Sequence, residues 1–117
     1  MWKAALMISY GLPIPGREVK ALTNFADAQT TFGKLAADGK CAEPEIFHHA
    51  DGGGFMLLRA EEPEILHEIL EMDEVRHAIN TALYTSLDFH HEIMVTGDVL
   101  MERMAEYTSI GSELGYM

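Results

Sequence analysis

Apolar residues recur along this chain with strand-like and helix-like periods in the order strand, helix, hairpin, helix, strand. Residues 2–10 are rich in apolar and strand-forming types and are followed by glycine and proline, which predicts a first strand. Residues 17–39 carry apolar side chains at helical spacing and end with an Asp-Gly pair, which predicts a long helix. The runs 44–50 and 55–60 flank an Asp-Gly-Gly-Gly turn and predict a β-hairpin.

The second half of the chain continues with a helix, a strand and a final helix. Residues 61–72 begin with Glu-Glu-Pro-Glu, which favours a helix N-terminus, and a short helical piece over 73–80 follows. Residues 83–95 alternate between apolar and polar types, so we predict a long strand with one face on a core. A Thr-Gly-Asp sequence then predicts a helix from about residue 97, and we expect 109–117, with two glycines, to be irregular.

This order, β-α-β-β-α-β with an added helix, is the split βαβ arrangement of a ferredoxin-like fold. We therefore predict an α+β sandwich with a four-stranded antiparallel sheet, both main helices on one face, and an extra C-terminal helix. The chain of 117 residues suffices for one core of two layers, so we expect one domain over 1–117. Its core would span about 2–95 and its helical extension about 97–117. The sheet face without helices needs a cover, and a second copy is the natural one.

Three segments resemble the dimeric α+β barrel superfamily. They are Phe-Gly-Lys-Leu-Ala-Ala-Asp-Gly-Lys at 32–40 before a strand, the triple glycine at 52–54, and Ala-Glu-Glu-Pro-Glu at 60–64 before a helix. The superfamily includes YCII-related proteins, muconolactone-isomerase-like enzymes and small cofactor-free or heme-using monooxygenases. The resemblance implies a homodimer whose facing sheets enclose a pocket for a small organic molecule. No catalytic signature of one family is present, so no family active-site residue is carried over.

Acidic residues outnumber basic ones by 19 to 8, which gives a formal net charge of −11. Phosphate backbones and anionic lipid surfaces attract the opposite sign, so we expect no nucleic acid and no membrane partner. The apolar runs are far shorter than the ~20 residues that cross a bilayer. The N-terminal run is also too short for a signal peptide. With Cys41 as its single cysteine, the chain fits a reducing, cytoplasmic location, and we expect that thiol to be structural.

The polar side of the last predicted strand carries the first candidate site. If its apolar side faces the helices, these residues point toward the partner sheet: Tyr84, Ser86, Asp88, His90, Glu92 and Met94. Alternate strand residues lie ~6–7 Å apart, so long side chains can converge on one ligand. We predict His90 as a general base, with Asp88 or Glu92 to orient it. Arg59 of the hairpin or Tyr84 would stabilise an anionic oxygen.

A metal-dependent protein is an alternative interpretation of the same residues. The hairpin carries His48 and His49, and neighbours on a strand point to opposite faces, so one of them can join His90 and a carboxylate. We choose His49 as the second metal ligand because it shares parity with Glu45 and Phe47. No dense ligand signature accompanies these residues, so the cofactor stays unassigned.

A non-catalytic interpretation also stays open. Alternating polar residues on a strand are most often a solvated face or a polar subunit interface. The chain would then be an interaction or assembly protein whose sheet face joins subunits. The first function hypothesis remains a homodimeric small-molecule-binding domain, which can be an enzyme, with its pocket between helices and sheet or inside the barrel.

Overall fold

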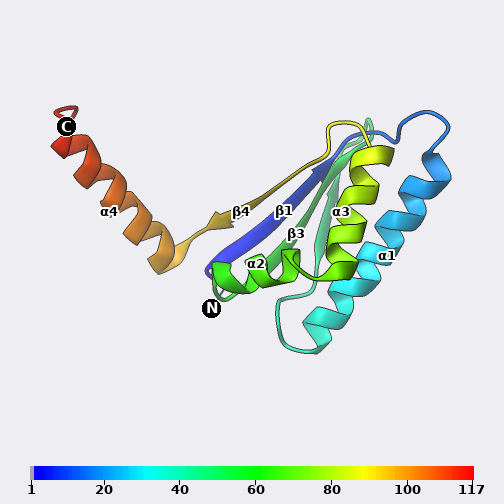
Figure 1. The fold of residues 1–117 in the computed structure, drawn as a ribbon, viewed down its shortest axis with the longest axis horizontal. Helices are drawn as coiled ribbons and strands as arrows, with labels where there is room; N and C mark the ends of the chain where they lie inside the picture. Colours follow the sequence, from blue (N-terminus) through cyan, green and yellow to red (C-terminus); the bar gives the residue numbers. More distant parts are fainter. Residues whose placement is uncertain (1) are drawn as a thin grey trace.

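Four antiparallel strands form one sheet in the order β2-β3-β1-β4 in the computed structural model, which describes residues 2–117 (Figure 1). The strands are β1 (Ala4–Tyr10), β2 (Glu45–His48), β3 (Gly54–Ala60) and β4 (His90–Val95). Leu6 of the central strand β1 lies opposite Leu58 of β3 on one side and Ile93 of β4 on the other. The sheet therefore has the strand number and pairing direction that the sequence predicts for a ferredoxin-like fold.

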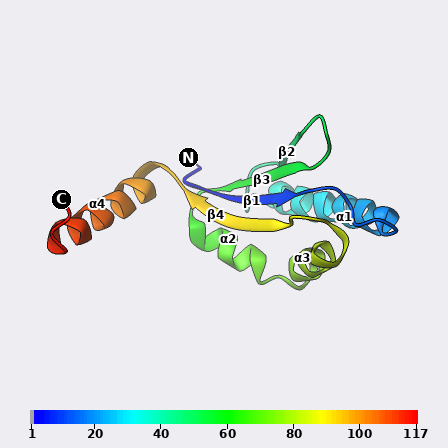
Figure 2. The same ribbon diagram turned by 90° about the horizontal axis from the view of Figure 1, so that it is seen from above.

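Three helices lie on one face of this sheet, and a fourth projects from its edge. The helices are α1 (Glu18–Ala37), α2 (Pro63–Leu70), α3 (Asp73–Thr85) and α4 (Gly97–Glu113). The elements α1 and α3 pack against each other, whereas α2 packs against β1, β3 and β4. Figure 2 shows α4 pointing away from the sheet and the other helices. Among residues 2–117, no helix combines the length and apolar content that crossing a membrane requires.

Alternating burial along β3 and at the start of β1 places the core on the helix side of the sheet. Leu6 and Leu58 are both 0% exposed and pack in one cluster with residues from the first three helices. The helical members are Phe32, Leu35, Leu66, Ile69 and Val75. The opposite side of the sheet, which we call the open face, carries the side chains of Ala5, Met7, Ser9, Glu45, Phe47, Phe55, Leu57, Arg59, His90, Glu92 and Met94.

The long strand predicted over 83–95 is wrong in its first half. The helix α3 continues to Thr85, and β4 begins at His90. The residues between them form a turn: Asp88 has φ 53°, and Leu87 is hydrogen-bonded to the loop after β1. The helical assignment prevails because the stripe that includes Val75 and Ala82 packs toward the core. The alternation over residues 83–89 is therefore a coincidence of composition, whereas that of β4 reflects a strand.

The C-terminal segment is also more ordered than the sequence predicts. The helix α4 runs to Glu113, and Gly115 then takes a left-handed φ of 83°. Two backbone hydrogen bonds close this end: the Tyr116 N–H donates to the Gly111 carbonyl at 2.9 Å, and the Gly115 N–H donates to the Ser112 carbonyl at 3.1 Å. This pattern is a Schellman motif, in which glycine ends a helix without steric cost. Of the two glycines in 109–117, Gly111 is therefore part of the helix and Gly115 ends it.

Candidate functional site

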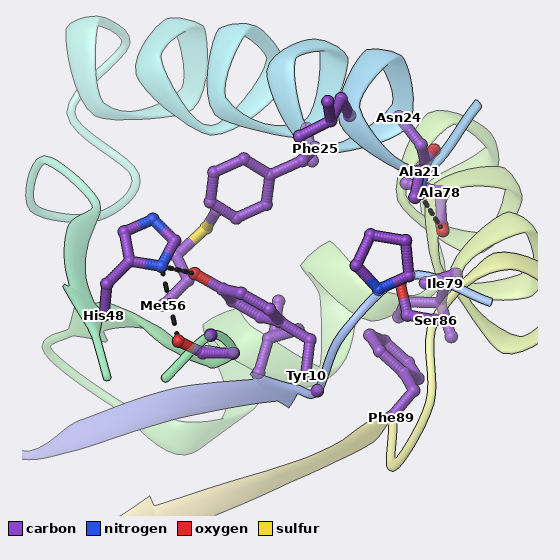
Figure 3. A pocket seen from close by; sticks show the side chains of 18 of the residues that line it. Tyr10, Ala21, Asn24, Phe25, His48, Met56, Ala78, Ile79, Ser86 and Phe89 are labelled. Atoms are coloured by element: carbon purple, nitrogen blue, oxygen red, sulfur yellow. Dashed lines mark hydrogen bonds between the residues drawn. The ribbon is translucent and has the colours of Figure 1, made fainter. Parts of the chain in front are cut away.

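A cavity of about 300 Å³ lies between the sheet and helices α1 and α3 (Figure 3). Its walls are largely apolar and come from both layers of the fold. The apolar side chains include Ile8, Phe25, Ala28, Phe32, Met56, Val75, Ala78, Ile79, Ala82 and Phe89. A cavity of this size and lining is typical of sites that hold small organic molecules. It corresponds to the first of the two predicted pocket locations, between helices and sheet.

A hydrogen-bonded pair of polar side chains, Tyr10 and His48, lines this cavity. The Tyr10 Oη atom lies 3.2 Å from His48 Nδ1, which is also 3.4 Å from the carbonyl oxygen of Gly53. The aromatic ring of Phe25 stands edge-on to the Tyr10 ring, with centroids 5.2 Å apart. Burial raises the pKa of the Tyr10 hydroxyl, which keeps it protonated and able to donate at neutral pH. Figure 3 shows the three side chains facing one another across the cavity.

The register of the sheet brings this pair together from distant parts of the chain. Tyr10, the last residue of β1, and His48, the last residue of β2, both lie opposite Gly54 of β3. A side chain at Gly54 would overlap the carbonyl oxygen of Phe47 in β2, and one at Gly53 would lie 2.7 Å from the Tyr10 carbonyl oxygen. The glycine turn therefore permits the close backbone approach that places both polar groups at one end of the sheet.

A second polar group marks the part of the cavity bordered by the two helices. The Asn24 side chain of α1 donates from Nδ2 to the backbone carbonyl of Ala78 in α3 at 2.9 Å. This hydrogen bond ties the two helices together at the cavity wall. Ser86, just beyond α3, also lines the cavity, as Figure 3 shows. The cavity thus combines a broad apolar lining with a few polar groups from separate elements.

Two of the predicted catalytic residues lie together on the open face. His90 Nε2 and Glu92 Oε2 are 3.9 Å apart on β4, with side chains 62% and 49% exposed. Arg59 lies on the same face but is paired elsewhere: its Nε donates to Glu45 Oε1 at 2.7 Å. In the order β2-β3-β1-β4, the Arg59–Glu45 pair belongs to one edge of the sheet and the His90–Glu92 pair to the other.

The other two predicted catalytic residues lie outside this face. Tyr84 belongs to the exposed surface of α3, where its backbone carbonyl accepts a hydrogen bond from Arg17. Asp88 lies in the turn before β4, beside the backbone of Gly11. Because β4 begins after Tyr84 and Asp88, neither side chain lies on the same strand face as His90.

The predicted metal pair is not brought together within one chain. His49 lies in the turn after β2, and His90 lies on β4, at opposite edges of the sheet. Among residues 2–117, no three His, Cys, Asp or Glu side chains are grouped in a way that could hold a metal ion. Of the adjacent histidines, His48 lines the cavity and His49 does not, and the metal role of His49 stays a prediction.

A signal for the cavity residues was present in the sequence. Tyr10 shares strand parity with the core residues Leu6 and Ile8, and His48 shares it with Ile46, the aliphatic residue of its short strand. These parities place both polar side chains on the helix side of the sheet. Asn24 and Phe25 gave no comparable signal, because their roles depend on how α1 packs against α3 and the sheet.

Comparison with known proteins identifies neighbours by structure alone. No family model and no curated protein matches the chain. A conserved protein of unknown function from Bacteroides thetaiotaomicron VPI-5482, described as a possible oxidoreductase, has a TM-score of 0.63 at 8% identity, covering 81% of this chain and 99% of that chain. A proposed antibiotic biosynthesis monooxygenase from Chloroflexus aurantiacus J-10-fl has a TM-score of 0.56 at 12% identity, covering 80% and 93%.

A third neighbour is described as dimeric. It is a protein of unknown function and ferredoxin-like fold from Bacteroides fragilis NCTC 9343, with a TM-score of 0.55 at 10% identity, covering 81% of this chain and 99% of that chain. The uncovered share of this chain is close in size to residues 97–117, which are 21 of the 117 residues. Identities this low show the fold alone, and the predicted ferredoxin-like fold is confirmed. This chain has the ferredoxin-like fold, extended by a C-terminal helix.

Proposed function

We propose that this chain is a homodimeric protein that binds a small, largely apolar organic molecule between its sheet and helices α1 and α3. One observation carries the proposal: an apolar cavity of about 300 Å³ that is lined by the hydrogen-bonded pair Tyr10 and His48. Binding pockets are typically apolar, with a few polar groups that fix the orientation of the ligand. The two side chains would bind a hydroxyl or carbonyl group of the ligand while its apolar part fills the cavity.

A second candidate function is proton-transfer chemistry at the same pair. An imidazole can accept a proton from a bound acidic group near neutral pH, and the protonated Tyr10 hydroxyl can donate a hydrogen bond to the anion that results. Names of two structural neighbours, a possible oxidoreductase and a proposed monooxygenase, support an enzyme in this fold. Turnover of a bound compound that is lost in His48→Ala would favour this candidate over simple binding.

We further propose that a second copy covers the open face. Its centre is apolar: Met7 lies opposite Leu57, and the rings of Phe47 and Phe55 stack with centroids 5.0 Å apart. Phe47 is 48% exposed, which is unfavourable for a large side chain in water. One structural neighbour is described as dimeric, which supports this arrangement. His90 and Glu92 would then border the interface, where they stay candidate site residues.

Replacing His48 should weaken the binding of a polar probe selectively. With naphthol as the probe, we expect His48→Ala to raise the dissociation constant about fivefold, because one ligand hydrogen bond contributes about 1 kcal/mol. Binding of naphthalene, which lacks the hydroxyl, should change little. The matched control is His49→Ala, since His49 is adjacent but outside the cavity. Methyl signals of Ile8 and Ile79, followed by NMR during titration, report binding at the cavity itself.

Two results would contradict the site. An equal loss of affinity in His48→Ala and His49→Ala would show that the cavity pair has no particular role. Unchanged Ile8 and Ile79 signals with every probe of this kind would show that the cavity takes no such ligand.

A charge on the open face should abolish the association through the sheet. We expect Leu57→Glu to lower the average mass at micromolar concentration below that of the wild type, because a buried unpaired carboxylate costs several kcal/mol. Sedimentation measures the mass, and Leu83→Glu is the control because Leu83 is exposed on α3, outside the open face. An unchanged mass in Leu57→Glu would contradict the sheet interface.

A further inference from the structure

The helix α4 is a complete element that packs on no other helix or strand of the described chain. Its start is held at the sheet: the Thr96 N–H donates to the Lys3 carbonyl at 2.8 Å, and Lys3 Nζ lies 3.5 Å from Asp98 Oδ2. Its end is closed by the Schellman motif at Gly115. Between these ends, no α4 residue is buried, and Figures 1 and 2 show the helix extending away from the body.

Large apolar side chains follow one face of this helix, which we call the α4 stripe. They are Leu100, Met101, Met104, Tyr107, Ile110 and, just past the helix, Leu114. Four of them, with Gly111, repeat at intervals of four and three residues, the spacing of a coiled-coil seam. Their exposed fractions lie between 38% and 69%. Most of the stability of helices in proteins comes from packing of their apolar face, so the stripe calls for a cover.

Acidic residues occupy the opposite side of the same helix. They are Asp98, Glu102, Glu106 and Glu113, which at 100° per residue all fall on the far side from the stripe. The one charged side chain of α4 on the stripe side is Arg103, which falls between Tyr107 and Ile110 at the border of the stripe. Two such helices can therefore pair through their stripes while all their carboxylates stay in water, as in the seam of a coiled coil.

We propose that the α4 stripe pairs with the α4 stripe of a second copy of this chain. A two-fold contact needs one self-complementary patch, and the apolar stripe, with Arg103 at its border and the acids on the far side, is such a patch. At roughly 200 Å² for a fully exposed large side chain, the stripe offers on the order of 700 Å² per copy. Two copies would bury about 1,400 Å² in total, which lies within the range of specific interfaces.

This contact is separate from the cavity and from the open face. The three structural neighbours are covered over 93–99% of their own length while about a fifth of this chain, close in size to residues 97–117, stays unmatched. The α4 contact therefore neither requires nor implies ligand binding. It supplies a second association step beside the proposed step through the sheet.

The test compares the mass of three variants with that of the wild type by sedimentation at micromolar concentration. Met104→Glu places a carboxylate in the stripe, and we expect it to weaken one association step about tenfold or more. The matched control is Ser109→Glu, which adds the same charge on the far side of α4 and should leave the mass unchanged. Met104→Glu combined with Leu57→Glu should be monomeric, because both steps are then lost.

The outcomes separate this proposal from the sheet interface. A wild-type mass in Met104→Glu, or an equal effect of Ser109→Glu, would overturn the α4 contact whatever Leu57→Glu does. A reduced mass in Met104→Glu with an unchanged mass in Leu57→Glu would support α4 pairing and remove the sheet interface.

In samples that mix isotope-labelled and unlabelled chains, contacts between Met104 methyl groups and Tyr107 rings of different copies should be visible by NMR. Their absence from an associated wild type would overturn the proposal as well.

Discussion

Replacing Gly54 with alanine is expected to lower the free energy of unfolding by about 3 kcal/mol and to displace His48 from the cavity. A Cβ atom at this position would overlap the carbonyl oxygen of Phe47 and lie 2.9 Å from the Cα atom of His48. Both atoms belong to the backbone of β2, so rotation of a side chain cannot relieve the overlap. The strand itself must move, and it carries the cavity histidine. Urea unfolding measures the stability, and the His48 ring signals in NMR report the displacement.

The matched control for this variant is Gly33→Ala in α1. An added Cβ at Gly33 meets no heavy atom within 4 Å, and alanine is the better helix former. We therefore expect this control to raise the free energy of unfolding by up to about 1 kcal/mol. If the two alanine variants unfolded with the same stability, the close approach of β2 to the hairpin turn would not limit the fold.

The order of elements and the core face of the sheet could be predicted because both depend on local patterns. The alternation along β1 and β3 reflects burial of every second residue, and the glycine turn marks the hairpin between β2 and β3. The failure over 83–95 shows the limit of such patterns. A polar–apolar alternation over five residues fits a strand and also fits the last turn of α3. The buried stripe through Val75 and Ala82 favours the helix.

The candidate site was harder to predict than the fold. Tyr10 and His48 are 38 residues apart, and their contact depends on the register of three strands. His49 was chosen by its parity with Glu45 and Phe47, which lie on the open face with His90, whereas His48 shares its parity with Ile46, which packs against the core. A short strand with one aliphatic residue leaves that parity weakly specified. The shared face of His90 and Glu92 was predicted, because it requires just the local alternation of β4.

The roles of the open-face residues, the absence of a nucleic acid partner and the cytoplasmic location stay predictions. Each depends on something outside one chain: a partner sheet, another molecule or a compartment. The charge of −11 supports the second of these by electrostatic argument alone. The cavity differs in kind, since its walls and its polar pair lie within the chain and can be tested on it directly.

Leu58→Ala is expected to lower the free energy of unfolding by about 3 kcal/mol, whereas the same change at Leu83 should cost less than about 1 kcal/mol. Leu58 is 0% exposed in the centre of β3, where truncation leaves a void that the neighbouring core side chains fill incompletely. Leu83 is 57% exposed on α3, although sequence alternation alone would place it on the apolar side of a strand. Urea unfolding at one fixed protein concentration compares the two variants, because association would otherwise shift the apparent stability. Equal losses at both positions would contradict the exposed position of Leu83 on α3.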